Sequence, residues 1–385
     1  MTAPAPTPDG PLVLTAERVV TGAGVLAPGW VRIEGGAITG VGDGTAPGNA
    51  RERTLDLGDV TLAPGFVDLH QHGGGGAAYT DGADAARTVI AAHRRRGTTS
   101  MLASLVTDDA DRLEHQIRAL APLVESGDLL GVHLEGPWLS PAHRGAHDPG
   151  LLTAPTAADV HRLVTAVPGA VRMVTLAPEL DGGVEAVAAL TAAGVVAAVG
   201  HTDASLDQGH AAIDAGARVG THLFNAERPL HHREPGVILA LLQRPEVTVE
   251  LIADGVHLHP AMLRHAAASA AGGFALVTDA MAAAGGPDGA YRLGPLDVEV
   301  TAGVARIAGT DTIAGSTLTL DRAVAFAVRK AGIDLEVALR AASTAPADVL
   351  GRSDLGRLTP GARADLVVLD AGLTVTRVMR AGAWI

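Results

Sequence analysis

Residues that can bind a metal ion recur in this chain directly after short apolar runs. In the first case, Val67-Asp68-Leu69 leads into His70-Gln71-His72. Later apolar runs end at Glu135, His201, His222 and Asp279. Short buried runs of this kind predict parallel strands, and the carboxyl ends of such strands meet at one face of a β/α barrel. The pattern therefore predicts a barrel with a metal-dependent hydrolytic site.

The spacing of these runs supports the same fold over residues 66–279. Eight apolar or β-branched runs predict strands at 66–70, 98–104, 129–135, 171–177, 195–201, 218–224, 247–253 and 274–279. Ala-rich stretches between them predict helices, for example at 83–96, 111–124, 157–167, 184–193, 207–215 and 260–271. This alternation predicts a TIM-like (β/α)8 barrel. A doubly wound open sheet is the alternative, but residues 73–76 lack the G-x-G-x-x-G frame of its phosphate turn.

The two ends of the chain have β-like segments without the alternating helices of the middle. Residues 12–61 carry β-like pieces, with a hairpin through Gly35-Gly36, and 366–369 and 375–380 read as strands. We expect both ends to form one small β-sandwich domain. The predicted boundaries are 1–62 and 357–385 for that domain and 63–356 for the barrel. A further hairpin is expected at 291–307, after the eighth strand.

Composition excludes several classes of protein. The chain has 385 residues, of which 47% are hydrophobic, and its net charge is −13. A large core is therefore available, and general binding to nucleic acid or to an anionic membrane is not expected. No apolar run approaches the roughly 18 residues of a membrane span. Residues 1–10 look like a short disordered lead without a secretory signal, so we expect a cytoplasmic enzyme.

The absence of certain residue types limits how a metal can be held. There is no cysteine, which excludes Cys-ligated zinc and thiolate nucleophiles. Lys330 is the only lysine, and it follows a helix-like stretch beyond the last metal-like strand. A carbamylated lysine bridging two ions is therefore not expected. A carboxylate must take that place, and Glu135 is the candidate.

Geometry assigns first roles to these residues. His70 and His72 are two residues apart on a strand end, so both rings point to the same side and can share an ion. Glu135 comes in register with His201 and His222. We expect His133 to point the other way, either as a packed histidine or as one that supports a metal ligand from behind. Asp279 suits a general base and acid beside a water activated by a metal.

A basic cluster points to an anionic substrate group. His231, His232 and Arg233 lie in a Pro-bounded loop of an acidic protein. Such a cluster is typical of a phosphate site, although an ordinary solvated loop has the same composition. His257 and His259 flank Leu258 just after the seventh strand, where one of them can face the same site.

The motifs resemble the amidohydrolase superfamily and, within it, the family of N-acetylglucosamine-6-phosphate deacetylases. The resemblance runs in order through nearly the whole chain, in the segments 64–73, 133–138, 145–149, 200–202, 221–226, 233–236, 253–257, 277–280 and 314–318. The tail, at 345–347 and 361–367, is similar to the C-terminal β domain of the superfamily. The central segments are specific to the deacetylases, whereas His-x-His and the tail are shared by the superfamily.

This resemblance implies how the metal and the catalytic groups are used. Glu135, His201 and His222 would hold the main ion. His70 and His72 would allow a second ion, with Glu135 bridging, so one or two ions per subunit are expected. Zinc is expected, and iron or manganese also fits these ligands. Asp279 would act as acid and base.

The resemblance also implies the substrate and the partner. His147 would contact the sugar or the acetamide carbonyl, whereas Asn225, Ala226 and His257 would help to bind a sugar phosphate. Arg233 would reach the phosphate of a neighbouring active site, which implies a homodimer. The implied reaction converts N-acetylglucosamine 6-phosphate into glucosamine 6-phosphate and acetate.

Other functions remain open at this point. The galacto epimer of the substrate differs by one inverted hydroxyl, whose partner the sequence does not show. A cyclic-amide hydrolase or a deaminase would use the same scaffold, and a scaffold protein without catalysis would have lost metal ligands that are present here. Glu227 stands where many relatives have Met. Its carboxylate would repel phosphate unless it points away or pairs with Arg228.

Overall fold

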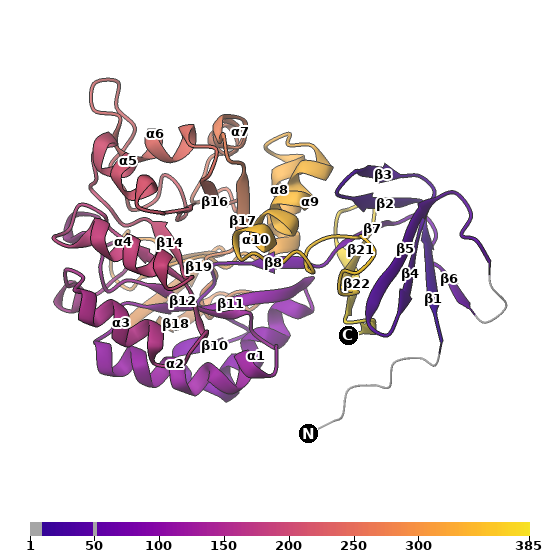
Figure 1. Cartoon of the computed structure of the whole chain (residues 1–385), viewed down its shortest axis with the longest axis horizontal. Coiled ribbons are helices and arrows are strands. Elements are labelled where there is room, and N and C mark those ends of the chain that lie inside the picture. Colours follow the sequence, from indigo (N-terminus) through magenta and orange to yellow (C-terminus); the bar gives the residue numbers. More distant parts are fainter. Residues whose placement is uncertain (1–9, 49–51) are drawn as a thin grey trace. The chain divides into compact units, whose positions relative to one another are not determined.

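The computed structural model describes residues 10–48 and 52–385 (Figure 1). Of the lead predicted at 1–10, all but Gly10 lies outside these residues. Packing divides the chain into two compact units. The first comprises Met1–Asp68, His93–Ser100 and Leu320–Ile385, and the second comprises Leu69–Ala92 and Met101–Thr319. The domain boundaries predicted at 62/63 and 356/357 remain a prediction.

The eight predicted strands form one sheet. In the sheet they follow their order in the chain: β8 (Phe66–Asp68), β11 (Thr98–Val106), β12 (Gly131–Glu135), β13 (Val171–Leu176), β14 (Val196–Val199), β15 (Val219–Gly220), β16 (Thr248–Ile252) and β17 (Phe274–Val277). Pairs from β11 to β17 are parallel. A parallel bridge between Gln71 and Ala280 joins the ends that follow the first and last strands. The barrel is therefore closed, which confirms the prediction and excludes the open sheet.

Helices follow the strands and lie outside them in Figure 1. They are α1 (Ala83–Arg94), α2 (Ala110–Glu125), α3 (Ala157–Thr165), α4 (Gly183–Ala192), α5 (Leu206–Asp214), α6 (Gly236–Gln243) and α7 (Pro260–Ser269). Five of them pack side by side in sequence order from α3 to α7. α6 was not among the helices predicted, because its sequence GVILALLQ is almost wholly buried and shows no polar face. No helix in the described part of the chain is both long and apolar enough to span a membrane.

The segment after β17 forms a separate small sheet. Its strands are β18 (Gly289–Leu293), β19 (Leu296–Thr301) and β20 (Val304–Ile307), paired antiparallel in that order. The predicted hairpin is therefore extended by a third strand, because Ala302 and Gly303 have φ of 52° and 75° and make a second tight turn. Leu293, Val298 and Val300 pack on the segment that follows β17. Shorter elements of this unit are β9 (Gly73–Gly74), β10 (Ala77–Ala78) and the 3-10 helices η1 (Tyr79–Asp81), η2 (Pro141–His143) and η3 (Pro149–Leu151).

The first unit holds a β-sandwich made from both ends of the chain. One sheet has the order β5-β4-β1-β6, and the other has the order β23-β22-β21-β7-β2-β3. The strands are β1 (Leu12–Ala16), β2 (Arg18–Thr21), β3 (Gly24–Leu26), β4 (Gly29–Glu34), β5 (Ala37–Asp43), β6 (Arg53–Asp56), β7 (Thr61–Pro64), β21 (Leu366–Leu369), β22 (Val375–Arg380) and β23 (Ala383–Trp384). The pairing of β21 with β7 joins the two ends, as predicted. Leu14 and Val31 of one sheet share a core with Leu62 and Val368 of the other.

The same unit carries the last helices, α8 (Leu320–Arg329), α9 (Leu335–Ala342) and α10 (Thr344–Val349). Lys330 follows α8 directly and is exposed, in agreement with its exclusion from any metal bridge.

Candidate active site

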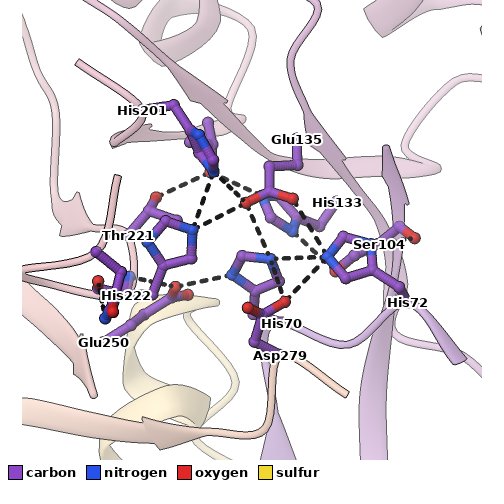
Figure 2. Close-up of polar contacts among 12 residues, drawn as sticks. His70, His72, Ser104, His133, Glu135, His201, Thr221, His222, Glu250 and Asp279 are labelled. Carbon is purple, nitrogen blue, oxygen red and sulfur yellow. Dashed lines mark hydrogen bonds and ion pairs between the residues drawn. The ribbon is translucent and has the colours of Figure 1, made fainter. Parts of the chain in front are cut away.

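The predicted ligands meet at the carboxyl ends of the barrel strands. Each follows or ends a strand, and all are at most 8% exposed. Figure 2 shows their side chains pointing toward one another. The residues brought together are His70, His72, Glu135, His201, His222 and Asp279. We call these six residues the metal cage.

Glu135 lies at the centre of the metal cage, and its two carboxylate oxygens face different histidines. Oε1 is 3.2 Å from Nε2 of His201, 3.1 Å from Nε2 of His222 and 3.3 Å from Nε2 of His70. Oε2 is 3.2 Å from Nε2 of His72. One carboxylate therefore borders both a His201/His222 donor set and a His70/His72 donor set, which is the bridging position predicted for it.

Hydrogen bonds on the far side of three rings fix which nitrogen faces the centre. Nδ1 of His70 is 3.1 Å from Glu250, Nδ1 of His72 is 3.3 Å from the carbonyl oxygen of Ser104, and Nδ1 of His201 is 2.8 Å from that of His143. Carboxylate and carbonyl oxygens only accept, so each Nδ1 must carry the hydrogen. When these rings are neutral, each Nε2 presents a lone pair to the cage, as in histidines that ligate a metal.

The spacing of these lone pairs fits a divalent ion. Nε2 atoms of His201 and His222 are 3.1 Å apart, and those of His70 and His72 are 3.2 Å apart. Nitrogen ligands at about 2.1 Å from one tetrahedral or octahedral ion would be ~3.0–3.4 Å from each other. Two ring nitrogens approach so closely only when a cation lies between them, either a proton on one ring or a metal ion. Each histidine pair together with Glu135 therefore fits one ion.

The charge balance of the metal cage also favours a cation. Burial alone would lower the pKa of His70 and His72, but neighbouring carboxylates outweigh it. Glu135 and Glu250 raise the pKa of His70 well above its usual value, and hydrogen bonds with Asp279 and Glu135 raise that of His72 to about 9. A site that draws protons onto its imidazoles in this way is one in which positive charge is stabilised.

Three of the six residues have a backbone conformation that L residues seldom adopt. The φ angles are 48° at His201, 27° at His222 and 47° at Asp279. Such a left-handed conformation costs of order 1–2 kcal/mol per residue and persists only where the surroundings impose it. For Asp279, the surroundings are the N–H bond to the His70 carbonyl (2.8 Å) and the bond from Ser316 N–H to its own carbonyl (2.7 Å). The backbone at these three residues is therefore strained, and this strained conformation directs their side chains toward the centre of the metal cage.

A cavity of about 200 Å³ opens over the metal cage. His147 lines it, with Nε2 3.4 Å from Oε2 of Glu135. The backbone N–H of Thr107 donates to Nδ1 of His147, so the hydrogen of this ring lies on Nε2. Burial lowers the pKa of His147 to about 4, despite the opposing effect of Glu135. A neutral imidazole N–H is therefore directed at the centre.

The lining of the cavity also includes the predicted sugar-phosphate residues, Asn225, Ala226 and His257. Nδ2 of Asn225 donates to the His222 carbonyl (2.9 Å), which leaves Oδ1 to accept from a ligand. Nδ1 of His257 is 2.7 Å from Asp254, and this carboxylate outweighs burial and raises the pKa of His257. The bond to Asp254 therefore favours the protonated form of the His257 ring.

Arg233 does not reach the cavity of its own chain. It lies in the exposed loop 229–235, and its guanidinium contacts Nε2 of His232 at 2.9 Å. It is not among the residues that line the cavity.

A family model for amidohydrolases matches residues 61–385. The chain belongs to the amidohydrolase family. It is 37% identical to the N-acetylgalactosamine-6-phosphate deacetylase of Escherichia coli O157:H7, over 95% of this chain and 97% of that one. It is 40% identical to the N-acetylglucosamine-6-phosphate deacetylase of Bos taurus, over 83% and 82% of the two chains. The crystal structure of N-acetylglucosamine-6-phosphate deacetylase from Mycobacterium smegmatis is 50% identical, covers 97% of this chain and all of its own, and superposes with a TM-score of 0.94.

Glu227 of this amidohydrolase does not face the cavity. It is 5% exposed, accepts the backbone N–H of Phe224 and is not among the lining residues. Arg228 pairs instead with Asp203, through two bonds of 2.9 Å. Burial raises the pKa of Glu227 to about 8, against the hydrogen bond from Phe224. The carboxyl is therefore largely neutral at pH 7 and does not oppose an anionic ligand.

In the amidohydrolase site, the direction predicted for His133 was wrong, although it is a packed histidine beside a predicted ligand, and one residue was missed. His133 lies on the same side of β12 as Glu135, because side chains two residues apart in a strand share a face. It sits below the cage, with its ring centroid 4.6 Å from that of His70 and with bonds to Ser104 and Thr175. The missed residue is Glu250, within β16. A charged residue inside the apolar run Thr248–Ile252 was the available signal.

Proposed function

We propose that this amidohydrolase hydrolyses the acetamide of N-acetylglucosamine 6-phosphate to glucosamine 6-phosphate and acetate. One observation carries the proposal: a single cavity is lined by five residues of the metal cage, Asp279 among them, by His147, and by His257 and Asn225. The cage and His147 are the groups that amide hydrolysis needs, and His257 and Asn225 can bind a sugar phosphate. Relatives named for this reaction match most of the chain.

The metal belongs in the metal cage. Glu135, His201 and His222 would hold one ion, and His70 and His72 would hold a second that shares Glu135. Zinc is proposed because imidazole-rich sites with a carboxylate suit it, and iron and manganese are the alternatives. A divalent ion there supplies Lewis acidity, which polarises a carbonyl and makes water more acidic near neutral pH.

Asp279 moves the proton during the reaction. Burial would raise the pKa of this carboxyl, but the hydrogen bond from His72 and the positive charge beside it hold the pKa below its usual value. With His70 and His72 as neutral ligands, a bound ion would supply that positive charge. Asp279 is therefore ionised at neutral pH, which is the form that accepts a proton from the attacking water. The same oxygen then returns the proton to the amide nitrogen, so that the amine can leave.

His147 stabilises the charge that develops on the carbonyl oxygen. Its Nε2–H points into the cavity beside Glu135, and the low pKa keeps this nitrogen a neutral donor. A fixed donor of this kind stabilises an oxyanion without reorganising during the reaction.

Other residues that line the cavity would bind the phosphate and hydroxyl groups of the substrate and its acetyl methyl group. His257 would bind the phosphate or a sugar hydroxyl, and Oδ1 of Asn225 would accept from a hydroxyl. Val106, Leu293 and Ile313 form the apolar part of the lining, and they would contact the acetyl methyl group.

The exposed position of Arg233 supports a homodimer. Its guanidinium belongs to none of the cavity walls in its own chain, and the loop around it carries Leu230, 47% exposed. We propose that Arg233 reaches the phosphate in the active site of a second copy, where bidentate contact with two oxygens suits a guanidinium.

The galacto epimer is a second candidate substrate. The relative from Escherichia coli O157:H7 named for N-acetylgalactosamine 6-phosphate matches 95% of the chain. The test is acetate release by the zinc-loaded protein from both phosphorylated epimers and from unphosphorylated N-acetylglucosamine. We expect N-acetylglucosamine 6-phosphate to turn over fastest. Faster turnover of the galacto epimer would select the second candidate, equal turnover with and without phosphate would refute the phosphate site, and turnover of none would leave a cyclic-amide hydrolase.

A further inference from the structure

Glu250 is a buried carboxylate that neither reacts nor lines the cavity. It lies within β16, is 0% exposed and is absent from the cavity walls. Its Oε2 is 3.1 Å from Nδ1 of His70 and 3.3 Å from the backbone nitrogen of His222 (Figure 2). A buried charge is costly, so a carboxylate kept in this place without access to substrate must stabilise something else.

The two groups that Glu250 contacts belong to different donor sets of the metal cage. His70 pairs with His72 on one side of Glu135, and His222 pairs with His201 on the other. Glu135 contacts both sets at the Nε2 atoms of their rings. Glu250 contacts both sets on the far side from these atoms, at Nδ1 of His70 and at the backbone N–H of His222.

His222 has a particular need for this contact. Its Nδ1 has no hydrogen-bond partner within the described residues, unlike Nδ1 of His70, His72 and His201. Its φ of 27° is also the least favourable of the three strained residues, because it falls short of the left-handed minimum. Backbone bonds hold the residues on either side, from Thr221 N–H to the Val199 carbonyl (2.8 Å) and from Leu223 N–H to the Glu250 carbonyl (2.9 Å). The N–H of His222 itself donates to Oε2 of Glu250 (3.3 Å), so this side chain supplies the contact at the strained residue.

We propose that Glu250 is a positioning residue that sets both donor sets at once. It keeps the hydrogen of His70 on Nδ1, so that Nε2 faces the ion, and it holds the backbone of His222 in the strained conformation that aims its ring. The proposal rests on the metal ligands assigned under the proposed function. Metal binding and turnover of the unmodified protein are therefore measured first, so that a failure of that assignment is seen separately.

The test compares Glu250→Leu, which removes the acceptor at similar size, with Glu250→Gln, which keeps an acceptor oxygen without the charge. Glu227→Gln is the matched control, because it changes another buried glutamate that contacts no metal ligand side chain. Zinc affinity is measured by competition with a chelator. The exchangeable Nδ1 proton of His70 is followed by NMR in the zinc-loaded proteins, since a bond to a carboxylate moves it far downfield.

We expect zinc affinity to fall about 10- to 100-fold in Glu250→Leu, the range typical for loss of such an outer partner. The His70 proton should be lost to exchange in that variant. In Glu250→Gln the proton should remain, at a smaller downfield shift, with a smaller loss of affinity. The control should match the unmodified protein in both measurements.

Either of two results would overturn the proposal. The first is unchanged zinc affinity and an unchanged His70 proton in Glu250→Leu. The second is loss of the His70 proton in Glu250→Gln, which bears on the proposal even if Glu250→Leu does not fold.

Discussion

The metal cage and the loop 229–235 hold their side chains in opposite ways. Cage residues are nearly inaccessible to solvent, and their ring nitrogens and carboxylates are fixed by neighbours on several strands. In the loop, His231, His232 and Arg233 are exposed and contact mainly each other. The comparison teaches that the residues of the metal cage are held in place by this chain's own core, whereas the loop has no such support, and its proposed phosphate contact would require a second copy.

The largest effect should come from the metal cage itself. Asp279→Asn keeps the size of the side chain but cannot take a proton from water. We expect turnover to fall by roughly 10³–10⁴-fold, near the upper range for loss of a general acid and base. Metal content should stay at the level of the unmodified protein, which elemental analysis checks. Normal turnover of this variant would sink the assigned mechanism.

A second test of the preorganised region is His147→Ala. Removal of a fixed donor to a developing oxyanion should lower kcat by about 10²–10³-fold. KM should change little, because the contact strengthens mainly in the transition state. Steady-state kinetics with N-acetylglucosamine 6-phosphate separates the two constants. A rise in KM at constant kcat would instead assign His147 to ground-state binding of the sugar.

The loop should respond more weakly and only with a phosphorylated substrate. Arg233→Ala should lower kcat/KM for N-acetylglucosamine 6-phosphate by about 10- to 100-fold, because a charge-assisted bond to the phosphate is lost. Arg264→Ala, which removes an exposed arginine of α7, should have no effect. Activity toward the unphosphorylated sugar should be equal in all three proteins.

Mixed dimers test whether Arg233 acts on a neighbour. A preparation of Asp279→Asn is mixed with one of Arg233→Ala after dissociation and reassociation. In a hybrid dimer, the active site with Asp279 intact receives Arg233 from the other chain, so kcat/KM should recover in part. The absence of any recovery would place Arg233 in its own active site or outside both.

The smallest effect belongs to Glu227, which is buried near the loop but does not enter the cavity. Its pKa is near 4.5 when exposed and about 8 when buried, so folding favours the protonated form. The unmodified protein should therefore lose stability relative to Glu227→Gln as the pH rises from about 4.5 to about 8, by up to a few kcal/mol at about 1.4 kcal/mol per pKa unit. Urea unfolding at pH 5 and pH 8.5 measures this difference. At pH 7 the two proteins should bind the phosphorylated substrate alike.

Local patterns were enough to predict the fold and most of the candidate site. Strand positions followed from apolar runs, and the ends β21 and β22 fell at the predicted residues. Ligands such as His201 and Asp279 were found because each directly follows its strand, and parallel strands of a barrel end at one face. Similarity in the segments between them then separated a deacetylase from other metal-dependent barrels.

Properties that depend on distant neighbours were beyond such patterns. The role of Glu250 depends on the Nδ1 of His70 and the backbone of His222, which lie 180 and 28 residues away in sequence. The neutral state of Glu227 depends on burial, which its position next to Arg228 did not reveal.

The sequence by itself determined which residue types stand at the ends of which strands, because apolar runs and side-chain alternation are local properties of the chain. Only the tertiary structure decided which nitrogen of His70, His72 and His201 faces the metal cage. It also decided that the pKa of Glu227 is raised and that Arg233 does not line the cavity of its own chain. Those properties follow from burial and hydrogen bonds between strands far apart in sequence. They exist only once the barrel has closed.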